Sequence, residues 1–348
     1  MKTRFKTIIK TAVFFLFLLL LFFSIQKTVS SPSDPRNYQL IRGFYAEPEN
    51  SLDAVFIGGS NAYAFYQPPV LWAAEGIKTA SYSCNGNRIS AAKYYMEEIR
   101  KKQKDPLFII VMNEYNLDIK ENKIHFHTDY VPFSVNKIHL IEALCDNAGI
   151  HGTDRLEYYF PIIRYHSRWK ELTKDDFHYA LDGLKGGSHY DKFLHAAEDQ
   201  GTGFTVTEER GDIPEDTLAC LKDLMEYCRA NDLRVLFIHS PQLVSEKQLK
   251  VYNAVDDLLN SSGFDTLNLC SCADEIGLDC RSDFYNKLHN NIHGSLKVSK
   301  FLARYLKENY SLGSCRRDDA AWNSAWTKYH KIISEAVTKD ELVGLEDS

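Results

Sequence analysis

Short apolar runs alternate with amphipathic stretches along most of the chain. In the amphipathic stretches apolar side chains recur at helical spacing, as in residues 91–102 and 218–230. The apolar runs have the length and composition of strands buried on both faces of a parallel sheet: Ala54–Ile57, Leu107–Met112, Val235–His239 and Thr266–Leu269. Strands alternating with helices predict an α/β protein, and we expect a flavodoxin-like three-layer α/β/α sandwich around a central parallel sheet.

The alternation is interrupted between about residues 116 and 214, where aromatic, histidine and charged side chains are dense. We interpret this stretch as a helical or irregular insertion that covers the functional site. A helix is expected after Gly294, and an aromatic pattern from Trp322, preceded by two aspartates, predicts a last helix. One large domain over residues 51–330 and a C-terminal tail over residues 331–348 follow from these boundaries.

The N-terminus has the features of an export signal. Three basic side chains lie within the first six residues, and the apolar stretch Ala12–Phe23 that follows approaches, with its flanks, the ~20 residues needed to cross a bilayer. Lys10 can extend to the cytoplasmic face. No A-x-A-like site follows, so a retained transmembrane anchor over residues 1–29 is favoured over a cleaved signal peptide.

The basic N-terminal side predicts a single-pass protein of the cell membrane, with the C-terminal domain outside the cytoplasm. Residues 30–50, rich in Ser, Pro and Asn, are interpreted as a linker that tethers this domain to the membrane.

Composition limits the classes of partner. The formal net charge is −6 and the chain has no long run of Lys and Arg, which excludes nucleic acid as the partner because that requires a concentrated positive surface. Eight cysteines in an exported chain form either disulfides or buried thiols. Cys270 and Cys272, with Cys280 nearby, lack the fourth ligand of a structural zinc site. We expect neither a metal nor a cofactor.

Two segments carry candidate chemistry. In the first, the strand ending at Ile57 runs through Gly58-Gly59 into Ser60 and a predicted helix, which places a hydroxyl at the strand end beside backbone N–H groups. Taken alone, this pattern also describes an ordinary turn with a helix cap. The second segment, residues 283–294, contains His289 on the loop before a helix, from where it can reach across the sheet edge to Ser60.

Together the two segments resemble the SGNH hydrolase superfamily, in which a Gly-x-Ser block supplies the nucleophile and an Asp-x-x-His block supplies acid and base. More narrowly, the chain is similar to bacterial membrane-anchored SGNH proteins whose last block reads Asp-Phe-Tyr-Asp/Asn-x-x-His-x-Asn-x-x-Gly. Tyr159–Leu172 and the stretch from Arg317 to Trp326 add to this likeness, which spans about residues 52–329.

The resemblance implies acyl transfer without a cofactor. His289 would remove the Ser60 proton, and Ser60 would attack an ester carbonyl. The family draws its oxyanion donors from the nucleophile's own N–H, a glycine and an asparagine, which correspond here to Ser60, Gly86 and Asn113.

The chain departs from the family at Asn286, three residues before His289, where an Asp is usual. An amide does not stabilise an imidazolium as a carboxylate does, and in serine proteases this exchange costs about four orders of magnitude in turnover. Three outcomes stay open: a Ser-His dyad oriented by a carbonyl oxygen, recruitment of Asp283 as the acid, or a protein that binds acylated substrates without turning them over.

Other polar clusters are weaker candidates. Arg164, His166 and Arg168 in the insertion are candidate contacts for an anionic or carbohydrate substrate. Two histidine pairs have metal-like spacing, but one lacks a third ligand nearby and the other coincides with the catalytic interpretation: His125-x-His127 and His289-x3-His293.

A serine acyl-transfer site at the outer face of a membrane predicts a serine esterase or O-acyltransferase that acts on esters of cell-wall or extracellular carbohydrate. The competing hypothesis is a catalytically weak or inactive SGNH scaffold that binds acylated polysaccharide or assists cell-envelope assembly. The acyl group, its acceptor and the choice between hydrolysis and transfer do not follow from the residues.

Overall fold

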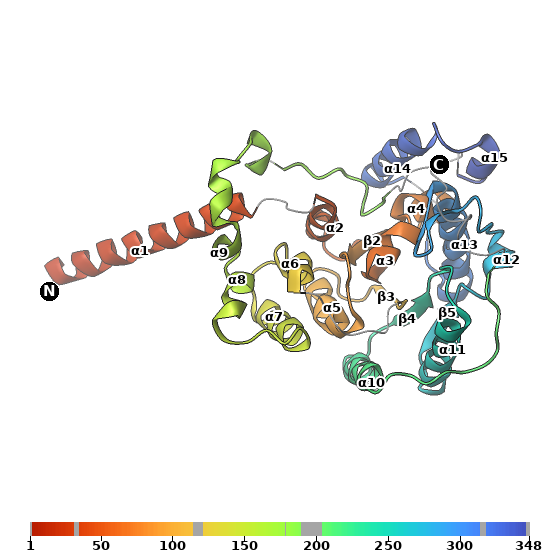
Figure 1. Ribbon diagram of the computed structural model, residues 1–348. Coiled ribbons are helices and arrows are strands. Elements are labelled where there is room, and N and C mark those ends of the chain that lie inside the picture. Colours follow the sequence, from red (N-terminus) through yellow and green to blue (C-terminus); the bar gives the residue numbers. More distant parts are fainter. Residues whose placement is uncertain are drawn as a thin grey trace.

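A five-stranded parallel sheet lies at the centre of the computed structural model, which describes residues 2–30, 35–113, 121–177, 179–188, 204–313 and 318–345 (Figure 1). The strands are β1 (Ala54–Gly58), β2 (Thr79–Ser83), β3 (Leu107–Val111), β4 (Val235–His239) and β5 (Asp265–Asn268), in the order β2-β1-β3-β4-β5. All neighbouring pairs are parallel. The four strands expected from apolar runs are therefore confirmed.

Strand β2 was not expected, because its sequence Thr-Ala-Ser-Tyr-Ser has no apolar run. It pairs with β1 at the edge of the sheet, yet all five of its residues are buried. The Ser81 and Ser83 hydroxyls lie 2.6 Å apart and bond to each other, which offsets the cost of burying them.

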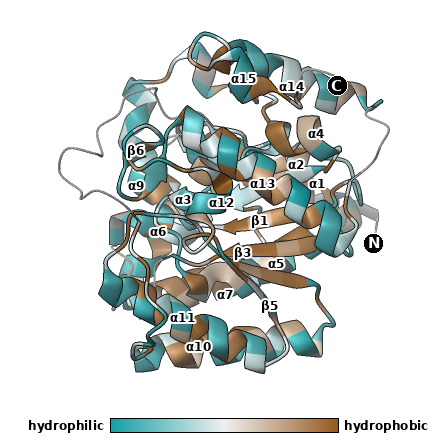
Figure 2. Cartoon of the chain, turned by 90° about the vertical axis from the view of Figure 1, so that its right-hand side faces the viewer, coloured by the Kyte–Doolittle hydropathy of each residue, from teal (hydrophilic) through white to brown (hydrophobic). Residues whose placement is uncertain are grey.

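Helices cover both faces of the sheet, because alternate side chains of each strand point to opposite sides. Val55 and Phe108 belong to one core cluster with residues of α5 (Ala92–Arg100), α10 (Glu215–Ala230) and α11 (Glu246–Ser261). Phe56 and Ile109 belong to another, with residues of α4 (Pro68–Glu75) and α13 (Ile292–Tyr310). Figure 2 shows α13 on one side of the sheet and α10 and α11 on the other. The predicted α/β class with a central parallel sheet is confirmed.

The expected linker over residues 30–50 is wrong for most of its length. Helix α2 (Pro35–Ala46) lies there and packs against β2, with Leu40, Ile41 and Phe44 buried in the main core. Leu40, Ile41 and Phe44 fall on one helical face, a pattern obscured in the sequence by the surrounding Pro, Ser and Asn residues. The folded body therefore begins near residue 35 rather than residue 51.

The C-terminal tail also belongs to the folded body. Asp319 caps α14 (Ala320–Ile333) by accepting from the Ala321 and Trp322 N–H groups, as the sequence indicated. Beyond residue 331 the chain continues into α15 (Lys339–Leu342), and Leu342 and the following Leu345 are buried in the core. A separate tail over residues 331–348 is therefore wrong as far as residue 345.

The described part of the insertion consists of short helices and irregular segments, and its longest helix joins the core. These elements are α6 (Glu121–Thr128), α7 (Val135–Asn147), α8 (Leu156–Tyr159), α9 (Ile162–Tyr165) and the 3₁₀ turns Gly152–Arg155, His166–Lys170 and Lys174–Asp176. Leu140 and Leu144 of α7 are buried in the same cluster as Val55. Residues 114–120, 178 and 189–203 of the insertion lie outside the described residues.

Helix α1 (Lys2–Val29) projects from the body as a single rod (Figure 1). Within Arg4–Val29 the mean hydropathy reaches 2.6 over a stretch of 18 residues, none of which is buried against the rest of the protein. By length and composition it is sufficient to cross a membrane.

We predict that Phe44→Ala lowers the free energy of unfolding by about 3–5 kcal/mol, because it opens a cavity under α2. Glu49→Ala, at an exposed residue just after the same helix, should change it by less than ~0.5 kcal/mol. Urea unfolding of the full chain in detergent, followed by near-UV circular dichroism, measures both. If the two substitutions changed the free energy of unfolding equally, residues 35–46 would be a linker rather than a packed helix.

Candidate active site

Ser60 lies where β1 gives way to α3 (Ser60–Phe65), at the carboxyl edge of the sheet. The two preceding glycines allow this turn. A Cβ at Gly58 would lie 2.9 Å from the Val111 Cβ, and Gly59 continues in extended conformation as the N-cap. Strand β1 is flanked by β2 and β3, so the turn opens at the point where the chain connections diverge to either side, the usual place for a site in an open parallel sheet.

His289 reaches Ser60 from a small hairpin of β6 (Phe284–Asn286) and β7 (His289–Asn290), which packs against α3. The His289 Nε2 lies 2.7 Å from the Ser60 Oγ, within hydrogen-bonding distance. The fold therefore brings together the two residues singled out at opposite ends of the domain, and both are half-buried.

Asn286 orients the imidazole and determines its tautomer. Its Oδ1 accepts from the Leu288 N–H at 2.9 Å, and because that donor requires an oxygen, the amide orientation is fixed. The same Oδ1 lies 2.9 Å from His289 Nδ1, which must then carry the proton. Nε2 is left as an acceptor, which allows the Ser60 hydroxyl to donate to it.

Burial lowers the pKa of His289 to about 4, and the positive charge of Arg36 acts in the same direction. The imidazole is therefore neutral at neutral pH, the form that a general base requires. A group whose folded-state pKa is depressed in this way makes the fold less stable as the pH drops from 6.5 towards 4.

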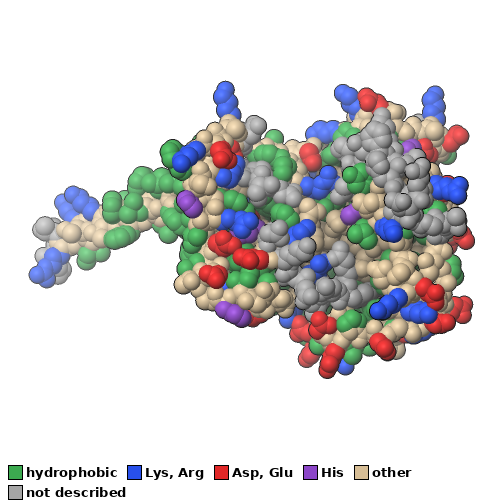
Figure 3. Space-filling view, in the orientation of Figure 1, with side chains coloured by type: hydrophobic (Ala, Val, Ile, Leu, Met, Phe, Trp, Pro, Cys, Tyr) green, Lys and Arg blue, Asp and Glu red, His purple; other side chains and the backbone are tan. Residues whose placement is uncertain are grey.

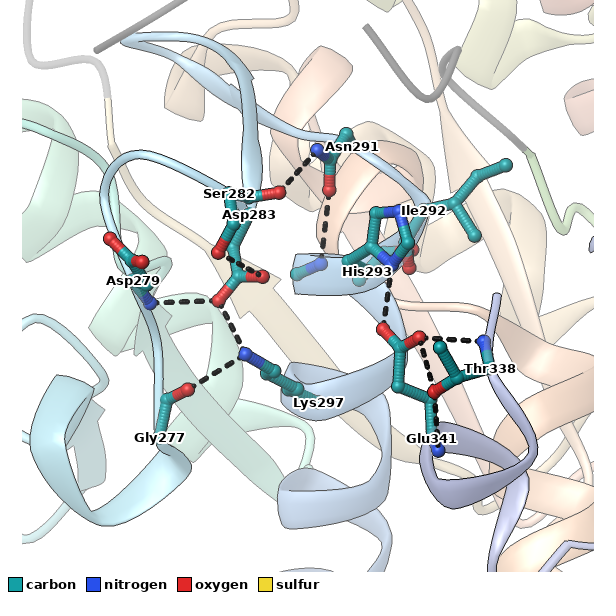
Figure 4. A network of polar contacts seen from close by, with 12 residues as sticks. Gly277, Asp279, Ser282, Asp283, Asn291, Ile292, His293, Lys297, Thr338 and Glu341 are labelled. Carbon is teal, nitrogen blue, oxygen red and sulfur yellow. Dashed lines mark hydrogen bonds and ion pairs between the residues drawn. The ribbon is translucent and has the colours of Figure 1, made fainter. Parts of the chain in front are cut away.

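Asp283 does not serve as the acid partner of His289, so that hypothesis is corrected. Its buried carboxylate accepts from Lys297 Nζ and from the Asp279 N–H, each at 2.8 Å (Figure 4). His289 Nδ1 is already occupied by Asn286. Asp283 instead ties the loop that carries the hairpin to α13.

Two further residues of the last block hold the same loop. Asn291 caps α13 by accepting from the Gly294 N–H, and its amide donates to the Ser282 carbonyl at 2.7 Å (Figure 4). Gly294 lies so close to Asp283 that an added Cβ would meet the Asp283 carbonyl oxygen at 2.2 Å. The contacts of Asn291 and Gly294 therefore explain their place in residues 283–294 by the packing of this loop.

The three predicted oxyanion donors differ in their surroundings. The Ser60 N–H, at the start of α3, has no acceptor among the described residues. Gly86 lies at φ +70° in the loop after β2, and its neighbour Asn87 donates to the Gly58 carbonyl, which holds this loop beside the turn at Ser60.

Asn113 has a structural role. Its Oδ1 accepts from Asn61 Nδ2 and from the Ser240 N–H, both at 2.9 Å, and its Nδ2 donates to the Ser240 carbonyl at 3.0 Å. These bonds join the ends of β3 and β4, and no described contact aims the Asn113 amide at the Ser60 hydroxyl.

The proposed substrate contacts of the insertion lie elsewhere. Arg168 donates to the Val29 carbonyl at the end of α1 and pairs with Asp176, and Arg164 pairs with Glu157. The His166 Nδ1 lies 2.8 Å from the Ile163 carbonyl oxygen. These residues surround the base of α1 and do not contact Ser60 or His289, because α9 and the turn after it pack against α1.

The histidine pairs do not form metal sites within the described residues. His125 bonds to Asp129 and Glu157, whereas His127 bonds to the Tyr95 hydroxyl. His293 pairs with Glu341 of α15 at 2.6 Å (Figure 4). The seven described cysteines form no disulfide with one another, and Cys315 lies outside the described residues.

Sequence reasoning missed the contribution of α2. The Arg36 guanidinium lies 5.3 Å from the centre of the Tyr63 ring on α3, and its charge acts on His289. The Asn37 Oδ1 accepts from the Asn85 N–H in the loop after β2. A helical pattern in residues 35–46 was the available signal, but nothing in it indicates which strand α2 covers.

No protein-family model and no curated protein matches this chain.

We predict that the rate of covalent modification of Ser60 falls as the pH drops through about 4, where His289 takes up a proton and no longer accepts one from Ser60. We call this fall in rate the acid limb of the pH profile. Arg36→Gln should move the acid limb to higher pH, because the substitution removes a positive charge that lowers the His289 pKa. Arg304→Gln, on an exposed arginine of α13, is the matched control. Rates measured with a fluorophosphonate probe, with circular dichroism at each pH, check this. A limb unmoved by Arg36→Gln would contradict the assigned influence of Arg36.

Proposed function

We propose that this chain is a membrane-anchored, extracytoplasmic serine esterase or O-acyltransferase of the SGNH type, with esters of cell-wall or extracellular carbohydrate as substrates. The proposed fold is a flavodoxin-like three-layer α/β/α sandwich. The strand order 2-1-3-4-5 is the one typical of flavodoxin-like doubly wound sheets, and it supports a flavodoxin-like three-layer sandwich.

The observation that carries the proposal is the chain of hydrogen bonds from Asn286 through His289 to Ser60. In the proposed reaction, Nε2 takes the Ser60 proton while Oγ attacks the ester carbonyl. The proton then passes from Nε2 to the departing alcohol, which leaves an acyl-serine. Water or an acceptor hydroxyl then gives its proton to Nε2 and attacks the acyl carbon. As the acyl–oxygen bond to Ser60 breaks, Nε2 returns the proton to Oγ, which restores the serine hydroxyl and the neutral imidazole.

The oxyanion formed in each step requires donors beside Ser60. The N–H of Ser60 and the backbone of the Gly86 loop are the candidates that the geometry supports. The Asn113 amide supports the site indirectly, because it bonds Asn61 next to the nucleophile.

Asn286 weakens the proposed centre less than the loss in serine proteases suggests. There, the Asp-to-Asn exchange costs about four orders of magnitude because it imposes the wrong histidine tautomer. Here the Leu288 N–H turns the amide oxygen towards Nδ1, which favours the working tautomer. What is missing is the charge that would stabilise the imidazolium.

That missing charge is also the observation that favours the second candidate function. An uncharged Asn286 and a His289 pKa of about 4 both disfavour the imidazolium intermediate. A protein that binds acylated polysaccharide, or assists cell-envelope assembly, needs the geometry of the site without that intermediate.

The proposed location rests on α1. A helix of this length and hydropathy, with basic residues at its start, supports a single pass with the N-terminus in the cytoplasm and the domain outside. Carbohydrate polymers of the cell envelope carry esters on that side, which is the reason for the proposed substrate class.

We predict that a fluorophosphonate probe labels the full chain in detergent, and that Ser60→Ala abolishes the label. Ser324→Ala is the matched control, because Ser324 is an exposed serine of α14 and the substitution should not affect the reaction. Intact-protein mass spectrometry counts the adducts. A folded wild-type chain that stays unlabelled would favour the binding function.

We predict that Asn286→Asp raises the hydrolysis rate of a nitrophenyl ester roughly 10- to 100-fold, the value of a hydrogen bond to a charged group. A carboxylate can accept from both Leu288 N–H and His289 Nδ1, so the geometry is kept while a charge is added. The His289 pKa should rise, and the acid limb should move to higher pH with it.

Asn286→Ala removes both hydrogen bonds and should lower the rate. If Asn286→Asp gave neither a faster reaction nor a shifted limb, the orienting role of Asn286 would be excluded.

A further inference from the structure

Exposed apolar side chains gather around the base of α1. Outside α1, twelve large hydrophobic residues of the described chain are exposed, and eight of them lie between residues 133 and 181. This concentration is not expected of a surface in water, where such side chains are scattered singly.

Five of these residues lie beside the end of α1, and we refer to them as the collar: Phe133, Phe160, Ile163, Trp169 and Phe177. The Phe160 ring packs edge-on against Phe22 with 6.2 Å between centroids. Ile163 and Trp169 belong to α9 and the following 3₁₀ turn, both of which contact α1. Phe133 and Phe177 line a cavity of about 430 Å³ together with Phe23 and Lys27 of α1.

The position of the collar along α1 corresponds to the boundary of a bilayer. Lys27 is the first charged residue after the apolar stretch, and Phe22 precedes it by five residues. At 1.5 Å per residue, Phe22, against which Phe160 packs, lies about 7–8 Å below Lys27 along the helix axis. Side chains of interfacial segments are buried about 5–10 Å into the headgroup and acyl boundary, which is the same range.

The charges around the collar are balanced. Arg164 pairs with Glu157 at 3.6 Å and Arg168 with Asp176 at 2.6 Å, while the Lys170 ammonium lies over the Trp169 ring. Figure 3 shows hydrophobic side chains continuing from α1 onto the adjoining body among residues of both charge signs. Apolar insertion, rather than attraction to anionic lipid, is therefore the interaction that this surface favours. Tryptophan is also a residue type enriched at membrane–water interfaces.

We propose that the collar docks into the headgroup and acyl boundary of the leaflet from which α1 emerges. The body is then held at two places, by α1 and by the collar, which restricts its tilt on the membrane. This gives a role to the stretch Tyr159–Leu172, which is part of the likeness to SGNH proteins but to which the acyl-transfer proposal assigns none. The inference rests on α1 crossing a bilayer and is independent of any reaction at Ser60.

Trp169 is a built-in probe of this docking. It is 65% exposed, whereas Trp72, Trp322 and Trp326 are 1%, 2% and 6% exposed. The test places the full chain, at low protein-to-lipid ratio, in phosphatidylcholine vesicles with or without bromine on the upper acyl chain. Bromine quenches only tryptophan that contacts it, so we expect the loss of the Trp169 share of the emission in brominated vesicles.

The control variants assign the signal. Trp169→Phe should abolish the quenching, whereas Trp326→Phe, the same change at a buried tryptophan, should leave it intact. Ile163→Glu should reduce it, because a carboxylate opposes insertion next to Trp169. Equal emission in both kinds of vesicle, or equal quenching in wild type and Trp169→Phe, would overturn the proposal. The first of these results would assign the collar to a protein partner or a second copy of the chain.

Discussion

One amide oxygen, Asn286 Oδ1, determines the state of the candidate centre, because it accepts from two donors at once. The Leu288 N–H makes the amide present its oxygen, and the oxygen then requires a proton on His289 Nδ1. Only in that tautomer does Nε2 accept from Ser60, 2.7 Å away. The turn between β6 and β7 thus determines the hydrogen bond from Ser60 to His289 through backbone geometry rather than through charge.

The hairpin in turn depends on a buried frame. Asp283 links the loop to Lys297 of α13, Asn291 caps that helix, and Gly294 lets the two segments approach. On the opposite side, Asn113 joins the ends of β3 and β4, and the Tyr252 hydroxyl donates to the Asn113 carbonyl. Buried polar groups of this kind are costly when unpaired, so their mutual satisfaction makes the site edge rigid.

The membrane end and the candidate centre are connected through α2. This helix follows closely on α1, packs on β2 and places Arg36 near His289. Just beyond this helix, Glu47 pairs with Lys185 at 2.9 Å. In the proposed arrangement, the collar holds the domain against the bilayer. Because the chain is folded from residue 35 onwards and no flexible tether follows, Ser60 lies at a defined distance from the membrane surface.

The sequence by itself determined the α/β class, four of the five strands, the apolar α1, and Ser60 and His289 as the pair to examine. These follow from local patterns: apolar runs, helical spacing, and a serine and a histidine at the ends of elements. It also indicated the Asp319 cap, since capping depends on a few adjacent residues.

Only the tertiary structure decided what depends on contacts between distant segments. The polar strand β2 is buried because α2 covers it, Asp283 is excluded as the acid because Lys297 and the Asp279 N–H hold it, and Arg168 faces α1 rather than Ser60. The direction of the Asn286 amide belongs to the same group. A residue's type limits which bonds it can form, but the partner it finds depends on how the chain packs, and no local pattern encodes that.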